Sequence, residues 1–167
     1  MVCNKLRECI EVLSKTPQEL DPSCVLRCSK GIGRDSYPKF EENKKSIVFH
    51  NPERREVLCY CVDGGMIDDT TIVKCDGLFV VLALNRAVFI ELKGKNVKHA
   101  IKQIGNTVRI YEKDLKNFGQ HGRIICSSAT PKLQNEPYYL KLDKHFRENG
   151  GRLLVKENRY LESVELL

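Results

Sequence analysis

The sequence predicts an α/β sandwich built around a central mixed β-sheet. Short apolar segments typical of strands occur through the first half of the chain, and a long helix with a single apolar stripe follows them. The strand expected at 87–93 is apolar on both faces, which is typical of a central strand covered on both sides. The chain has 167 residues, enough to bury a real core, so we expect one domain over residues 1–167.

The first half of the chain is expected to supply one helix and then most of the sheet. Residues 4–15 carry apolar side chains at a helical period and end at a Thr-Pro pair. The segment 17–45 is rich in Pro, Gly, Ser and charge, and its stretch SKGIGRDS is expected to be a loop. Four strands with a tight turn at Asn85-Arg86 are then predicted, at 46–50, 56–62, 71–84 and 87–93.

The clearest element is a helix that follows Gly94, with Asn96 as its N-cap. Its apolar residues follow a 4-3-4-3-4 spacing, which places one stripe along about five turns: Val97, Ile101, Ile104, Val108, Tyr111 and Leu115. The rest of the chain is predicted to form a strand at 123–127, a loop at 129–138, a short helix at 141–149 and a last strand at 152–156.

Composition excludes some classes of protein. The longest apolar stretch, 78–84, has seven residues, whereas a membrane-spanning helix needs about 20, so we expect no membrane partner. The N-terminus carries acidic residues where a signal peptide needs an apolar core, which favours a cytoplasmic location. The eight cysteines contain no C-x2-C pair, so reduced and mostly buried thiols are favoured over a disulfide scaffold or a zinc site.

Three charged residues stand out because they adjoin strands that are otherwise apolar. Glu91 and Lys93 lie two apart at the end of the strand 87–93, so they project from the same face. Asp76 comes just before the apolar run 77–82. A buried carboxylate is costly unless it is paired or bound to metal. Two acids and a lysine on one face suit hydrolysis assisted by a hard cation such as Mg2+.

The register between the two strands decides whether these residues meet. If Leu84 pairs with Ala87 across a tight turn, opposed residue numbers sum to 171. Asp76 then shares a face with Glu91 but lies opposite Lys95. A longer turn or a bulge would close the gap, and a slip of one residue would break the shared face.

The ordered set of residues resembles the PD-(D/E)xK nuclease superfamily over about residues 56–127. The resemblance rests on Asp76 before an apolar strand, on Glu91 and Lys93 in the next strand, and on a helix that carries Gln103. It implies a restriction-endonuclease-like α/β/α sandwich and a phosphodiesterase, more often an endonuclease than an exonuclease, that uses Mg2+ or Mn2+. By position, Asp76 and Glu91 would be the metal ligands, Lys93 the catalytic lysine, and Gln103 the residue that positions water or phosphate.

The sequence departs from the pattern of the superfamily in two respects. Cys75 stands where the proline of the superfamily's name would be. A further acid, often supplied by the first helix, has three open candidates: Glu8, Glu11 and Glu56.

Positive charge is concentrated beside these acids. Residues 86–116 hold eight Lys or Arg against three Asp or Glu, a local net charge of +5 out of +6 for the whole chain. At 100° per residue, one side of the helix is basic, and lysine and arginine there would neutralise phosphates. Nucleic acid is therefore the expected partner, and the resemblance to the superfamily implies DNA more often than RNA. Four residues are predicted to bind it: Lys95, Lys98, Lys102 and Arg109.

Two other functions compete with a nuclease. The first is a catalytically inactive, nuclease-like module that only binds nucleic acid. The second is a cysteine-rich interaction protein in which Glu91 and Lys93 form a structural pair. A homodimer is compatible with the nuclease hypothesis, because small nucleases that cut two strands often work in pairs.

Overall fold

The computed structural model describes Leu6 and residues 29–128 and 132–167. In this part of the chain a six-stranded sheet has the order β1 (Ser29–Gly33), β4 (Val57–Cys61), β5 (Gly77–Val81), β6 (Arg86–Leu92), β7 (Gly119–Cys126) and β8 (Leu153–Glu157). A three-stranded sheet has the order β2 (Lys39–Glu42), β3 (Lys45–His50) and β9 (Arg159–Ser163). The helices described in full are α3 (Val97–Tyr111) and α4 (Pro137–Glu148).

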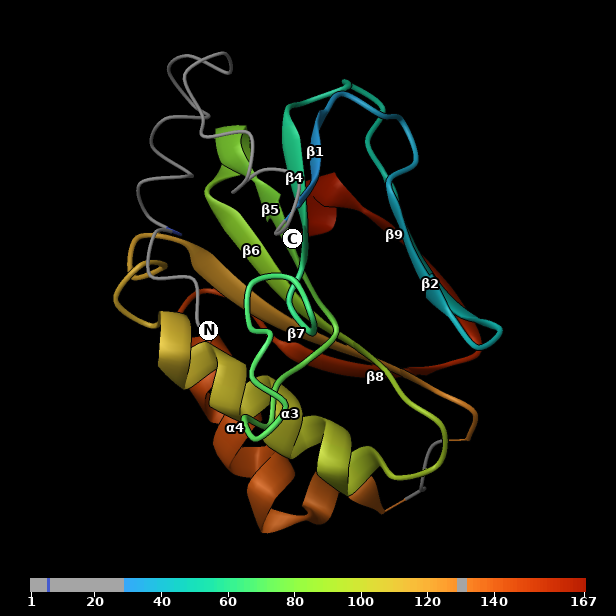
Figure 1. Ribbon diagram of the computed structural model, residues 1–167, viewed down its shortest axis with the longest axis vertical. Coiled ribbons are helices and arrows are strands. Elements are labelled where there is room, and N and C mark those ends of the chain that lie inside the picture. Colours follow the sequence, from blue (N-terminus) through green and yellow to red (C-terminus); the bar gives the residue numbers. More distant parts are fainter. Residues whose placement is uncertain (1–5, 7–28, 129–131) are drawn as a thin grey trace.

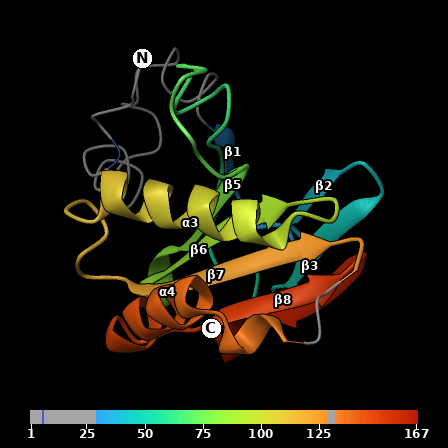
Figure 2. The ribbon, with the colours of Figure 1, turned by 90° about the horizontal axis from the view of Figure 1, so that it is seen from below.

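The six-stranded sheet is mixed and forms the middle layer of the molecule. Strands β1, β4, β5 and β6 pair antiparallel, whereas β6, β7 and β8 pair parallel. Helices α3 and α4 lie side by side on one face of this sheet, and the three-stranded sheet packs on the other face (Figures 1 and 2). The predicted α/β sandwich with a mixed sheet is therefore confirmed.

Alternation along β6 divides its side chains between two cores, as expected for a central strand. Phe89 packs in the core under the helices, and Ile90 packs in the core between the two sheets. Phe79 of β5 also lies between the sheets, where its ring stacks on Phe49 at a centroid distance of 4.0 Å. Because residues 87–92 of β6 are buried, a polar side chain in that part of the strand is removed from water.

A buried ion pair joins the two sheets. Arg123 of β7 donates from Nε and from a terminal nitrogen to the two carboxylate oxygens of Glu162 on β9, at 2.7 and 2.8 Å. Both residues are buried. His121 lies two residues along the same strand, and burial together with the nearby Arg123 lowers its pKa to about 3. Such a pair is costly to break from one side, because the remaining charge is left buried alone.

Several predicted elements differ from the observed ones. The stretch SKGIGRDS, predicted to be a loop, contributes β1, which pairs with β4. The strand expected at 71–84 is limited to β5, since Leu82–Leu84 form a 3₁₀ turn. Strands β2 and β9 lie where no strand was predicted. The helix expected at 4–15 lies outside the described residues apart from Leu6, which is helical and buried.

The later elements follow the predictions with shifted ends. Helix α3 begins at Val97 as expected, with the Asn96 side chain accepting the backbone N–H of His99, and ends at Tyr111. Strand β7 begins at Gly119 rather than 123, and α4 begins at Pro137, a residue favoured in the first turn of a helix. No described helix has both the length and the apolar character needed to cross a membrane.

Candidate functional site

The register between β5 and β6 brings Asp76 opposite Glu91. Gly77 pairs with Ile90 and Val81 pairs with Arg86, so opposed residue numbers sum to 167 rather than 171. Continued by one residue, the same register sets Asp76 against Glu91. The tight turn predicted at Asn85-Arg86 is wrong: four residues connect the strands as a 3₁₀ turn, and Asn85 ends it in the left-handed region with φ 50°. A change of four in the sum keeps the predicted shared face.

The two acids and Lys93 lie on the helix side of the sheet. Glu91 lies two residues after Phe89 and therefore on the same face as that residue, which belongs to the core under the helices. The residue exposure of Glu91 is 1%. Lys93 continues the ladder beyond β6, where its N–H donates to the Ile125 carbonyl at 2.8 Å. The Lys93 Nζ atom lies 3.5 Å from Glu91 Oε1. One oxygen of Asp76, Oδ2, accepts the backbone N–H of Leu92 at 2.6 Å.

Burial perturbs both carboxyl groups in the same direction. Desolvation, followed by the charge of Asp76, raises the pKa of Glu91 to about 8, against the opposing effect of Lys93. Desolvation raises the pKa of Asp76 to about 6, although the Leu92 N–H and Lys93 oppose it. A paired site of this kind holds a proton near neutral pH until a cation replaces it.

The oxygen atoms of this pair fit a hard cation. Glu91 Oε2 is buried and has no hydrogen-bond partner among the described residues. In that part of the chain no group of three or more His, Cys, Asp or Glu side chains is placed to hold a metal ion. Magnesium does not require such a cage, because it commonly binds through one or two carboxylates, with water and substrate phosphate oxygens completing its shell. Asp76 and Glu91 therefore suit Mg2+ in the presence of a phosphate ligand.

Gln103 of α3 lies against the segment that leads into Asp76. Its Nε2 donates to the carbonyl of Lys74 at 2.9 Å, and its Oε1 is buried without a hydrogen-bond partner among the described residues. One turn further along, Thr107 Oγ1 accepts the Cys75 N–H at 2.9 Å and donates to the Gln103 carbonyl at 3.0 Å. The helix thus fixes the two residues immediately before Asp76.

Thr107 is the residue that sequence reasoning missed. It is buried, and it lies four residues after Gln103 on the edge of the apolar stripe of α3. The sequence signal that could have identified Thr107 is its spacing from Gln103. Residues at i and i+4 share a face of a helix, so these two polar side chains lie together beside the apolar stripe.

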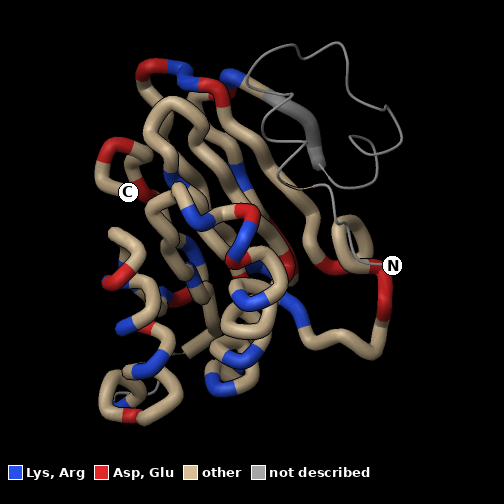
Figure 3. The backbone as a smooth tube through the Cα atoms, turned by 90° about the vertical axis from the view of Figure 1, so that its left-hand side faces the viewer, with Lys and Arg blue, Asp and Glu red and all other residues tan. Residues whose placement is uncertain are grey.

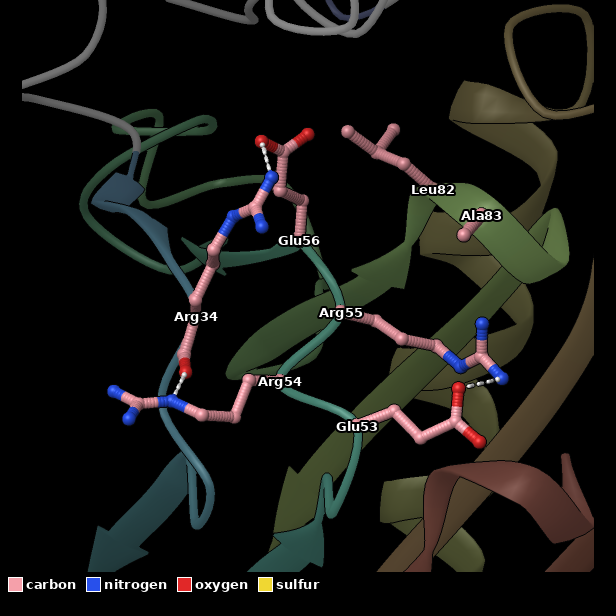
Figure 4. A pocket seen from close by; sticks show the side chains of 7 residues that line it. All are labelled: Arg34, Glu53, Arg54, Arg55, Glu56, Leu82 and Ala83. Atoms are coloured by element: carbon pink, nitrogen blue, oxygen red, sulfur yellow. Dashed lines mark hydrogen bonds and ion pairs between the residues drawn. The ribbon is translucent and has the colours of Figure 1, made fainter.

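The three candidates for the further acid are resolved only in part. Glu8 and Glu11 lie outside the described residues. Glu56 lies at the opposite end of the sheet, since it precedes Val57, which pairs with Val81. There it forms an ion pair with Arg34 at 2.8 Å in a surface hollow of about 420 Å³ (Figure 4). Glu56 is therefore not part of the site.

Two acids outside the predicted set face Asp76. The charges of Glu42, at the end of β2, and of Asp63 both raise the pKa of Asp76. Asp63 is engaged in an ion pair with Lys74 at 3.0 Å. The negative potential at Asp76 therefore comes from two other segments, the end of β2 and the segment at Asp63, and it strengthens the attraction of Asp76 for a cation.

The four residues predicted to bind nucleic acid are exposed and lie along one helix and its entry. Lys95 and Lys98 line a small hollow of about 160 Å³, and Lys102 and Arg109 line a larger groove. The Lys and Arg positions of both helices recur on the same side of the sheet (Figure 3). The four residues thus line two depressions that share Tyr138 in their lining.

Four cysteines lie among the described residues and are in no disulfide: Cys59, Cys61, Cys75 and Cys126. Cys75 and Cys126 are buried, and burial raises the pKa of the Cys75 thiol well above its usual value. Cys61 is exposed and Cys59 is half-buried, which differs from the expectation of buried thiols. The other four cysteines lie outside the described residues.

Comparisons with protein-family models, with curated proteins and with solved structures find no match to this chain.

Proposed function

We propose that this protein is a metal-dependent nuclease that hydrolyses phosphodiester bonds, with a restriction-endonuclease-like core. The observation that carries the proposal is the register of β5 and β6. It sets Asp76 opposite Glu91 and leaves Lys93 on the same face, within 3.5 Å of the Glu91 carboxylate. This is the arrangement expected from the superfamily that the sequence resembles.

In this proposal Asp76 and Glu91 hold Mg2+, and Mn2+ substitutes for it. The bound cation would polarise a phosphoryl oxygen and lower the pKa of a water molecule. Burial raises the pKa of Glu91, so its carboxyl would have to release a proton to the solvent in order to hold the cation. Lys93 is 29% exposed at its side chain, so its ammonium can orient the attacking water or stabilise negative charge that develops on the phosphate.

Gln103 and Thr107 act as positioning residues in this site. Their hydrogen bonds to the backbone at Lys74 and Cys75 hold the residue that follows, Asp76, at a fixed distance from α3. A metal ligand held by such outer contacts keeps its orientation when the substrate arrives.

The substrate class follows from charge. The basic residues of α3 give affinity for a phosphate backbone without reading bases, and DNA remains favoured over RNA by the resemblance. The cysteines of the described residues are in no disulfide, which favours a reducing compartment such as the cytoplasm. A homodimer remains part of the proposal only for substrates with two strands to cut.

An inactive module that binds nucleic acid is the second candidate. The groove and the basic helix would serve that role without any metal. The buried Glu91 argues against it, because a module that only binds has no use for a desolvated carboxylate whose Oε2 lacks a hydrogen-bond donor among the described residues.

The test is divalent-dependent cleavage of single-stranded, duplex and branched DNA, and of RNA, by wild type, Glu91→Gln and Lys93→Ala. We expect cleavage with Mg2+ or Mn2+ by wild type alone, with a loss of at least a hundredfold in either variant. Glu56→Gln is the matched control, since it changes an acid at the other end of the same sheet. Equal inertness of wild type and variants on every substrate, or equal cleavage by all of them, would end the proposal.

A further inference from the structure

A groove runs over the outer surface of α3, between the segment 71–73 and α4. Its volume is about 860 Å³. It lies on the helix side of the sheet, and the segment 71–73 and α4 flank α3 from opposite sides (Figure 2). Tyr138 of α4 lines both this groove and the smaller hollow at the start of α3, so the two depressions adjoin.

The groove combines an apolar lining with cationic side chains. Val73 is 43% exposed, and Ile72 and Tyr138 are half-buried, so part of their apolar surface faces the groove. Lys102, Arg109 and Lys141 are exposed along it. Among the described residues none of these three cations forms an ion pair with an acid. Polyanions with apolar groups are the ligands that match both properties.

One wall of the groove is continuous with the proposed catalytic segment. Asn106 donates from its side chain to the carbonyl of Val73, and Gln103 donates to the carbonyl of Lys74. Asp76 follows only two residues after Lys74. This wall therefore belongs to the same segment of chain that carries Asp76.

We propose that this groove binds a single-stranded segment of nucleic acid. A duplex presents its phosphates at the surface and keeps its bases stacked inside, so it could use the cations but not the apolar lining. An unstacked strand can place phosphates on Lys102, Arg109 and Lys141 while its bases pack on the tyrosine and aliphatic side chains. The inference deepens the proposed function, on which it rests for the path to Asp76, by naming the substrate class.

Tyr138 is the residue on which the proposal depends most. Lys98 Nζ lies over one face of its ring, 5.1 Å from the centroid, so a base would stack on the opposite face or displace the lysine. Base stacking on an aromatic side chain changes affinity by about five- to 150-fold per base on alanine substitution. Tyr138→Phe keeps the ring and should keep the affinity.

Binding is measured by fluorescence anisotropy of a labelled 12-nucleotide DNA strand and of its duplex, in EDTA so that no cleavage occurs. The proteins are wild type, Lys102→Ala/Arg109→Ala, Tyr138→Ala and Tyr138→Phe. Lys144→Ala serves as the control, because this exposed lysine of α4 does not line the groove. Circular dichroism confirms that each variant is folded.

We expect the single strand to bind at least tenfold more tightly than the duplex, and Tyr138→Ala to lose about tenfold in affinity. The double variant should lower the slope of log affinity against log salt by about 1.4, since each lost phosphate contact removes about 0.7. Equal affinity for both DNA forms, or variants that match Lys144→Ala, would overturn the proposal. So would tight binding of an acidic amphipathic peptide without binding of the strand.

The outcome is separable from that of the nuclease proposal. Selective binding of the strand by a protein that never cleaves would leave the groove assignment standing and remove the nuclease. Metal-dependent cleavage that is unaffected by the groove variants would leave the nuclease proposal standing and remove the groove assignment.

Discussion

Replacement of Glu91 by glutamine should stabilise the protein at pH 8 while it abolishes metal-dependent cleavage. Glutamine has nearly the size of a protonated glutamic acid and cannot ionise. The buried carboxyl has a pKa of about 8 against an ordinary 4.5, so folding disfavours its charged form. A raised acid pKa costs nothing below pH 4.5, and the cost grows with pH until the folded group ionises near pH 8.

The magnitude follows from the size of that shift. Each pKa unit corresponds to about 1.36 kcal/mol, so a rise from 4.5 to about 8 costs wild type on the order of 4–5 kcal/mol at pH 8. Urea unfolding in EDTA at pH 4.5 and pH 8 measures this cost. We expect Glu91→Gln to match wild type at pH 4.5 and to exceed it by several kcal/mol at pH 8.

Magnesium supplies the second arm of the experiment. Addition of Mg2+ at ten times its dissociation constant should stabilise wild type by about 1.4 kcal/mol at pH 8, and Glu91→Gln by far less. Glu56→Gln is the control, because it disturbs a surface ion pair worth about 0–1 kcal/mol in any buffer. If Glu91→Gln destabilises the protein at pH 8, the pair with Lys93 is structural and the reasoning is refuted.

Two further substitutions test other parts of the structure. Thr107→Val removes the acceptor of the buried Cys75 N–H, so urea unfolding should show a loss of stability of about 1–3 kcal/mol, and the kcat of cleavage should fall. Thr107→Ser should keep both near the wild-type values. Full activity in the valine variant would show that Thr107 has no positioning role. Arg123→Met leaves the buried Glu162 with only the guanidinium of Arg152, 4.0 Å away, and should cost about 3–5 kcal/mol at pH 7. Stability should recover when Glu162→Leu is added, and an unchanged urea midpoint would show that the pair contributes nothing.

The elements that could be predicted from the sequence are those with a strong hydrophobic period. The stripe from Val97 determined α3, and the apolar run around Phe89 determined β6 as a central strand. Strands β2 and β9 gave no such signal because each buries a single residue, Phe40 in one and the charged Glu162 in the other. A single buried residue produces no hydrophobic periodicity, and a charged residue is predicted from sequence to lie at the surface.

The site could be predicted as a set of residues but not as a geometry. The prediction that Asp76 and Glu91 share a face requires only that the sum of opposed residue numbers be odd. It therefore held although the predicted register was wrong by four. Their direct opposition depends on the 3₁₀ turn at Leu82–Leu84, which neither apolar alternation nor a Gly-containing turn motif indicates. Gln103 and Thr107 contact backbone rather than side chains, so no complementary residue type in the sequence pointed to their partners.

The turn between β5 and β6 therefore controls chemistry that takes place elsewhere. Five residue pairs separate it from the opposed acids, about 17 Å at the rise of an antiparallel strand. Asn85 ends this turn with φ 50°, a conformation that asparagine tolerates and β-branched residues do not. An Asn85 variant would thus lose activity because the register of β5 and β6 shifts and the two acids no longer lie opposite each other. Screens for inactive variants should therefore also find substitutions at the end of the sheet that is far from the acids.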